Sequence, residues 1–154
     1  LDAVIDEYDY ILIDSPPALG MITLNALTAA DEVIVPMPCE FFALDGLAEL
    51  METVRRIQAG PNPKLQLGGI VLTMADERTN LGSAVAHEVR TAFPGKVFQT
   101  RIPRNVRLAE APSHGKPVAF YDLKSKGAQA YIDLAREWMG MSAAMTAALS
   151  KEDA

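Results

Sequence analysis

The sequence is poor in the residues that build disulfides, metal sites and membrane spans. It has one cysteine and two histidines, and no apolar run approaches the ~20 residues that a membrane-spanning helix needs. Because Cys39 has no second cysteine to pair with, no internal disulfide can form, and a reducing compartment such as the cytoplasm is expected. His87 lies in a predicted helix without a second ligand at i+4, and His114 belongs to a Ser-His-Gly-Lys loop where it is expected to shape a turn, so no histidine metal site is predicted. A basic stretch followed by an apolar one, the mark of a secretory leader, is also lacking.

The composition is that of a folded domain. The chain has 154 residues, of which 49% are hydrophobic and 22% are charged, and this length suffices for one hydrophobic core. The first residue is Leu1 rather than methionine, and an apolar run follows soon after it, so we expect that further residues precede it. We expect one domain over residues 1–139 and a tail over residues 140–154 that is helical and then disordered.

Positive charge is concentrated in one segment, although the net charge of the chain is −6. Residues 96–126 contain seven lysines and arginines against Glu110 and Asp122, a net charge of +5, so the remainder of the chain carries −11. The local field matters more than the net charge when a protein binds a polyanion. The asymmetry indicates either a basic surface for nucleic acid or an ordinary solvated surface whose charges are paired in the fold.

Short apolar runs alternate with segments of helical periodicity. The runs predict strands at residues 10–14, 32–36, 67–73 and 97–102, and the periodic segments predict helices at 24–30, 44–58, 80–93 and 125–139. Nearly continuous apolar runs suit strands that are buried on both faces. The alternation therefore predicts an α/β fold, a three-layer sandwich around a mostly parallel sheet.

The residues that end these strands are expected to lie along one rim. They are Asp14, Pro36, Thr73-Met74 and Pro103. Ligands of open parallel sheets bind at the carboxyl ends of the strands, which meet at the same edge. Simpler interpretations stay open for two of them, since Met74 could fill the core and Pro103 could merely end a strand.

An aspartate closes the first predicted strand. The run Tyr10-Ile-Leu-Ile-Asp14-Ser-Pro-Pro17 has the Walker B arrangement, in which a carboxylate at the sheet edge orients water on Mg²⁺ bound to nucleotide phosphates. Taken alone, Asp14 could be a cap or a turn residue. The two prolines after it stiffen the turn, and with the segments described next they favour the nucleotide interpretation.

Five segments, in order along the chain, resemble the ParA/Soj partitioning ATPases of the deviant Walker type, which have the P-loop NTPase fold. They are residues 14–20, residues 23–36, the Leu-Thr-Met-Ala-Asp-Glu-Arg-Thr-Asn run at 72–80, the Ile-Pro-Arg-Asn-Val-Arg-Leu-Ala-Glu-Ala-Pro-Ser-His-Gly-Lys-Pro run at 102–117, and residues 121–131. The resemblance covers the chain from about Tyr8 to Met139 and indicates the C-terminal part of such a protein.

The resemblance implies a site for ATP and Mg²⁺. Asp14 would be the catalytic carboxylate and would hold Mg²⁺ through water. The residues that would contact the nucleotide are Pro16, Met74, Pro103, Arg104 and Asn105.

The resemblance also implies a surface for DNA. Arg78 and Arg107 correspond to arginines that contact DNA without sequence preference in this family, and Lys124 and Lys126 would widen the surface. The planar guanidinium suits phosphate because it donates two parallel hydrogen bonds. The alternative for Arg78 is an ion pair with a neighbouring carboxylate such as Asp76.

The family cycle implied for the intact protein has several partners. ATP would favour a homodimer that binds DNA in the bacterial cytoplasm at the nucleoid, and a ParB-type centromere-binding protein would stimulate hydrolysis and release. The family's phosphate loop, Lys-Gly-Gly-x-Gly-Lys-Thr, is not in this sequence, and the pair Gly68-Gly69 has no Lys-Ser/Thr after it. We therefore expect this chain alone to bind ATP weakly and not to hydrolyse it.

Three other functions stay open at this point. One is a non-enzymatic module that binds DNA or dimerises without nucleotide. Another is a MinD-type membrane ATPase, which would need a basic amphipathic helix at the C-terminus, whereas Lys151 is the only basic residue after residue 139. The third is a metabolic ATPase of the same fold. The sequence does not separate a chromosomal from a plasmid system.

Overall fold

The computed structural model describes residues 4–16, 18, 20–40, 43–76 and 80–152, with side chains in these ranges except at 80–81 and 141–152. The chain divides into two compact units. The first unit holds residues 1–34 and 44–68, and the second unit holds residues 35–43 and 69–154.

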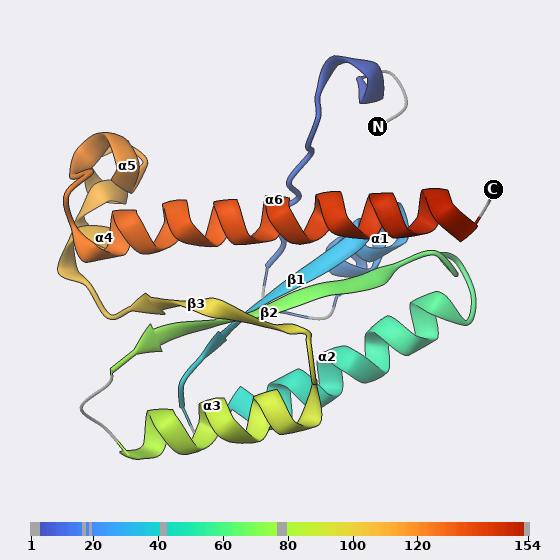
Figure 1. Cartoon of the computed structure of the whole chain (residues 1–154), viewed down its shortest axis with the longest axis horizontal. Coiled ribbons are helices and arrows are strands. Elements are labelled where there is room, and N and C mark those ends of the chain that lie inside the picture. Colours follow the sequence, from blue (N-terminus) through green and yellow to red (C-terminus); the bar gives the residue numbers. More distant parts are fainter. Residues whose placement is uncertain (1–3, 17, 19, 41–42, 77–79, 153–154) are drawn as a thin grey trace. The chain divides into compact units, whose positions relative to one another are not determined.

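A three-stranded sheet runs through the described residues in the order β1-β2-β3. β1 spans Glu32–Pro38, β2 spans Gln66–Ala75 and β3 spans Val97–Pro103. β2 and β3 are parallel, and all three arrows point the same way in Figure 1. The α/β class, the parallel sheet and three of the four predicted strands are thereby confirmed, each strand one or two residues longer than predicted at one or both ends.

The first unit is built around two helices. α1 spans Met21–Ala29 and α2 spans Ala43–Gln58, and a short 3-10 helix, η1, spans Ile5–Glu7. Apolar side chains at helical spacing bury one face of α2, which ends before the Gly60-Pro61 stop. The buried cluster is made of Leu27, Val54, Ile57 and Leu65. Asn62 fastens the loop after α2 to the end of α1, because its amide donates to the carbonyls of Leu27 at 3.0 Å and Ala30 at 2.7 Å.

The second unit has a helix on each face of its part of the sheet. α3 spans Asn80–Ala92 and α6 spans Lys126–Glu152, and they lie on opposite sides of β2 and β3 in Figure 1. Between β3 and α6 lie α4 (Val106–Glu110), η2 (Ala111–His114) and α5 (Val118–Tyr121). The buried side chains of this unit come mainly from β2, β3 and α3, and they include Ile70, Val71, Leu72, Val85, Val89, Phe98 and Ile102.

Gly69 makes room for the largest fully buried side chain. A Cβ on Gly69 would lie 2.4 Å from Cε2 of Phe98, closer than any real carbon contact. Glycine is therefore required at this position by the approach of the ring to the β2 backbone. Gly68-Gly69 accordingly lies inside a strand, as the sequence predicted.

A carboxylate from α6 closes an irregularity in β3. Ile70 is level with Val97 and Leu72 is level with Arg101, so β3 has two extra residues between these pairs. The amides of Gln99 and Thr100 fall in this bulge, and the Glu137 carboxylate accepts from them at 2.6 Å and 2.9 Å. Glu137 thus satisfies edge-strand donors that would otherwise be open to another chain.

The prediction of a buried strand at residues 10–14 is wrong for this structure. None of these residues is in a strand, and the side chain of Leu12 is 78% exposed. A strand of this composition gains its stability from neighbours that cover its faces and pair with its edges. No described strand pairs with residues 10–14.

Candidate functional site

The ends of β2 and β3 meet at one rim, as the sequence predicted. Ala75 is level with Pro103, and the backbone amide of Arg104 donates to the carbonyl of Ala75 at 3.3 Å. Met74 and the Pro103-Arg104-Asn105 turn therefore lie on neighbouring strand ends. The residues predicted for the base side of a nucleotide are brought together by backbone pairing.

Met74 is strained and exposed. Its φ is +50°, the only positive value at a non-glycine residue in the described part of the chain, and its side chain is 51% exposed. A non-glycine residue in this region costs on the order of 1–3 kcal/mol and is found mostly at functional sites. The alternative in which Met74 fills the core is wrong, because its side chain faces solvent at the strand end.

The turn after β3 is held by its own side chains. The Asn105 Oδ1 accepts from the amide of Arg107 at 2.9 Å and so caps the N-terminus of α4. Arg104 lies 3.5 Å from the Glu40 carboxylate, with both side chains exposed. Asn105 thus has a local structural role that the sequence did not predict. The ion pair of Arg104 with Glu40 is weak, so a ligand that binds Arg104 would lose little by breaking it.

Asp14 and Pro16 belong to the first unit, and both are exposed. The loop that follows them is attached to α1 through Thr23, whose buried hydroxyl donates to the carbonyl of Ala18 at 2.7 Å. Met74 and Pro103 belong to the second unit. A single nucleotide hollow that joins Asp14 to the β2–β3 rim therefore stays a prediction.

Arg107 is engaged by two carboxylates. Its Nη1 lies 2.8 Å from Oε2 of Glu110, and its Nε lies 3.3 Å from Oδ2 of Asp122. The Tyr121 hydroxyl donates to the same Glu110 oxygen at 3.3 Å, and the Tyr121 ring stacks on His114 with centroids 4.8 Å apart. The hydrogen bond between Arg107 and Glu110 raises the pKa of the arginine and lowers the pKa of the glutamate.

Of the other predicted DNA contacts, the structure describes Lys124 and Lys126. Arg78 lies outside the described residues. Lys124 and Lys126 are both exposed and flank Ser125, whose hydroxyl accepts from the amide of Ala128 at 3.2 Å at the start of α6. Cations at a helix N-terminus oppose the helix dipole, so these lysines reinforce a positive field there instead of stabilising the helix.

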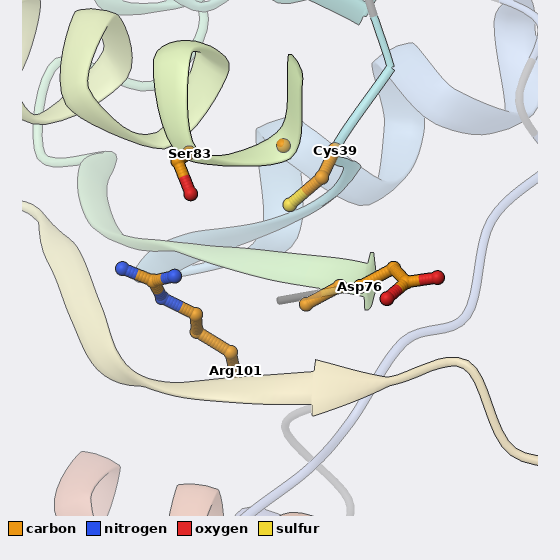
Figure 2. Close-up of a pocket in the computed structure, with 6 residues that line it drawn as sticks. Cys39, Asp76, Ser83 and Arg101 are labelled. Carbon is orange, nitrogen blue, oxygen red and sulfur yellow. The ribbon is translucent and has the colours of Figure 1, made fainter. Parts of the chain in front are cut away.

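A small hollow near the end of β1 was not predicted. Its lining residues come from β1's end, β2, α3 and β3, and they are Cys39, Ala75, Asp76, Gly82, Ser83 and Arg101. Cys39 and Ser83 point into the same space, whereas the Asp76 carboxylate is directed away from it (Figure 2). Its empty volume of about 210 Å³ includes open solvent, so the enclosed space is much smaller than a site for a small molecule.

Burial governs the chemistry of the cysteine in this hollow. Burial raises the pKa of the Cys39 thiol, although the nearby Arg101 and Arg90 act in the opposite direction. A thiol that stays protonated is a poor nucleophile. Among the residues that the structure describes, no three His, Cys, Asp or Glu side chains gather where they could hold a metal ion.

Comparison with known proteins identifies the family. A family model described as an AAA domain matches residues 1–67. The sporulation initiation inhibitor protein Soj of Bacillus subtilis is 56% identical over 137 residues, which is 89% of this chain and 54% of that protein. The chromosome partitioning protein ParA of Caulobacter vibrioides is 57% identical over 130 residues, or 84% of this chain and 49% of that protein. The chain belongs to the ParA/Soj family.

A solved structure agrees with the ParA/Soj assignment at the level of the fold. Cobyrinic acid a,c-diamide synthase from Mycobacterium smegmatis, determined with a bound ATP analogue and magnesium, superposes with a TM-score of 0.70 at 34% identity. The superposition covers 90% of this chain and 51% of that one. The chain spans about half the length of the ParA/Soj relatives that it matches.

In the part of the chain that the structure describes, no helix is both long enough and apolar enough to cross a bilayer.

Proposed function

We propose that this chain is the C-terminal part of an ATP-dependent partitioning ATPase that segregates DNA, with residues 1–139 forming part of a single NTPase domain. The observation that carries the proposal is the 52–57% identity to Soj and ParA proteins over most of the chain. The meeting of Met74 with the Pro103 turn supports it, because the family resemblance implies a nucleotide contact at both positions.

In this proposal the chain supplies the base side of the nucleotide site and the Walker B carboxylate. Exposed Met74 offers an apolar surface for a base, and Pro103, Arg104 and Asn105 border it on the next strand end. Asp14 and Pro16 lie on a loop whose exposed carboxylate would orient water on magnesium. ATP with Mg²⁺ would supply the phosphoanhydride whose cleavage drives the cycle.

The basic segment supplies a DNA surface that reads phosphate and not sequence. Arg107, Lys124 and Lys126 are exposed on the segment that carries a net charge of +5, and we place Arg78 with them. In the intact protein, ATP would favour a homodimer, and two linked weak surfaces would gain avidity without new contacts. A ParB-type centromere-binding protein would stimulate hydrolysis, and the cycle would run in the cytoplasm at the nucleoid.

The chain alone is expected to lack catalysis, since its sequence contains no Lys-Gly-Gly-x-Gly-Lys-Thr phosphate loop. The same absence favours one alternative, a non-enzymatic module that binds DNA without nucleotide. The two differ in the intact protein: the partitioning ATPase requires ATP for tight DNA binding, whereas the module binds equally well without it.

The proposed DNA binding is tested by fluorescence anisotropy with two labelled duplexes of unrelated sequence. Both duplexes should bind the purified chain with the same Kd, and log Kd should rise with log salt with a slope of roughly 3 if Arg107, Lys124 and Lys126 each contact a phosphate. Replacing these three residues by alanine should abolish the binding. As a matched control, Arg55, Arg56 and Lys64, three basic residues of the first unit, are replaced by alanine. Equal loss in both triple variants would show that only net charge matters.

A further inference from the structure

The side chain of Arg107 is shared between two anions before any DNA arrives. Two different nitrogens of the guanidinium are used, Nη1 by Glu110 at 2.8 Å and Nε by Asp122 at 3.3 Å. The Arg107 side chain is still 51% exposed, so a further ligand can reach it from solvent. The guanidinium of Arg107 is therefore accessible to solvent, but its positive charge is already paired with two carboxylates.

Hydrogen bonds from neighbouring residues hold the Glu110 carboxylate and the backbone of Asp122. The Glu110 oxygen that faces Arg107 also accepts from the Tyr121 hydroxyl at 3.3 Å, and His114 stacks on the Tyr121 ring. Asp122 is fixed through its backbone, because its carbonyl accepts from the Ser125 hydroxyl at 2.8 Å and its amide donates to Val118 at 2.8 Å. The Glu110 carboxylate therefore has a second hydrogen bond besides its pair with Arg107, and the backbone that carries the Asp122 side chain is hydrogen-bonded on both sides of that residue.

A phosphate that approaches Arg107 meets both carboxylates at close range. Each carboxylate already pairs with one nitrogen of the guanidinium, so a phosphate either displaces one of them or binds the remaining N–H donors against the repulsion of both negative charges. Ion pairs between exposed side chains are weak, so a polyanion that makes several contacts can displace them. The pairs therefore weaken DNA binding without preventing it.

We infer that Glu110 and Asp122 compete with DNA phosphate for Arg107 and so set the affinity of the DNA surface. This inference rests on the DNA binding proposed above. In this inference Glu110 and Asp122 do not orient Arg107 for DNA. Their ion pairs reduce its affinity for phosphate, so removal of either carboxylate should strengthen DNA binding. A ParA-type protein that must leave DNA in every cycle gains from an affinity kept low in this way.

The test measures the Kd of a labelled duplex for the whole chain and for variants with one negative charge removed. Glu110→Gln and Asp122→Asn each remove one of the carboxylates that pair with Arg107. Glu88→Gln is the control, because it makes the same change of net charge at an exposed residue of α3 that is neither of these two ion-pair partners. Arg107→Ala and the double variant Arg107→Ala with Glu110→Gln complete a cycle. Thermal melts of each variant establish that it is folded.

Competition predicts that Glu110→Gln and Asp122→Asn each tighten binding by about threefold to fivefold, as loss of an exposed ion pair allows. Glu88→Gln should tighten it by less than about twofold, because charges beyond a Debye length are screened. In the Arg107→Ala background, Glu110→Gln should have no more effect than Glu88→Gln.

Each other outcome overturns the inference in a recognisable way. Weaker binding by a folded Glu110→Gln variant means that Glu110 positions Arg107 for DNA. Equal gains in Glu110→Gln and Glu88→Gln mean that only net charge is felt. If the chain binds DNA and Arg107→Ala leaves its Kd unchanged, the inference fails while the proposed function stands. If neither the chain nor the charge-removal variants bind, the inference fails together with the DNA surface proposed for this chain.

Discussion

Two apolar runs of similar length have opposite fates in this chain. Residues 67–73 become the middle strand of the sheet with Ile70 and Leu72 fully buried, whereas residues 10–14 stay outside it with Leu12 78% exposed. Both runs have the composition of a buried strand, so composition does not explain the difference. β2 has a partner on each edge, and no described strand pairs with residues 10–14. A buried parallel strand is thus a property of its neighbours as much as of its own sequence.

The largest effect should separate these two runs directly. Leu72→Ala should lower the free energy of unfolding by about 3 kcal/mol, because it leaves a cavity among fully buried side chains. Leu12→Ala removes the same atoms from an exposed site and should change it by less than about 0.5 kcal/mol. Urea unfolding followed by circular dichroism measures both. Similar losses in the two variants would mean that residues 10–14 are buried in solution.

The second-largest effect concerns the contact that lets β2 and β3 pack. Gly69→Ala should destabilise the chain by about 2 kcal/mol, because the new Cβ would overlap the Phe98 ring. Gly46→Ala is the matched control, since a Cβ there meets nothing within 4 Å inside helix α2, and it should stabilise by roughly 0.5–1 kcal/mol. Opposite signs in the two variants are expected in the same urea experiment. A neutral Gly69→Ala would show that the ring has room to move.

Glu137 should give a smaller effect that depends on pH. Burial of the carboxyl disfavours its charge, but hydrogen bonds from Thr100 and Gln99 outweigh burial and lower the pKa of Glu137. Its stabilisation is therefore present above the ordinary glutamate pKa of about 4.3 and is lost as the pH falls through the lowered value in the folded state.

Glu137→Gln should accordingly cost about 1 kcal/mol at pH 7, a charged hydrogen-bond contribution reduced for partial exposure. The cost should shrink as the pH falls below the lowered pKa. Glu88→Gln, which is exposed on α3, serves as the control. A loss for Glu137→Gln that is the same at pH 7 and at pH 3 would contradict the assigned role of the carboxylate.

The smallest effect concerns the strained end of β2. Met74→Gly should stabilise the chain by about 0.5–1 kcal/mol, because glycine adopts a positive φ without the Cβ clash, and the gain is partly offset by a more flexible unfolded chain. Met74→Ala keeps the Cβ and removes the rest of the exposed side chain, so it should be close to neutral. Chemical denaturation of the two variants gives the difference. Equal stability of the glycine and alanine variants would mean that no strain is held at this position.

The sequence was sufficient for elements whose stability is decided locally or by a simple period. Helix α2 was predicted from apolar spacing and its Gly60-Pro61 stop, and the β2–β3 rim from the rule that parallel strands end at one edge. Contacts between residues that are far apart in the chain could not be predicted from the sequence. Glu137 lies 37 residues from Thr100, and nothing in either segment signals that one will cap the other.

The proposed DNA surface shows the same division. The basic segment and Arg107 were visible in the sequence, and the i,i+3 spacing of Arg107 and Glu110 was a signal for an ion pair that could have been used. The Asp122 contact depends on how α4 and α5 pack, and the strain at Met74 depends on the turn at the end of β2. Neither follows from a pattern along the chain.

Catalysis is decided most directly by measuring ATP hydrolysis by the purified chain with Mg²⁺, in the presence and absence of DNA. The expected result is no turnover above the rate in buffer, because a Walker B carboxylate without oriented phosphate-binding amides and lysines cannot stabilise the transferring phosphoryl group. Turnover by the chain that is lost in Asp14→Asn would contradict this, and would mean that these residues hold a complete phosphate site of another kind.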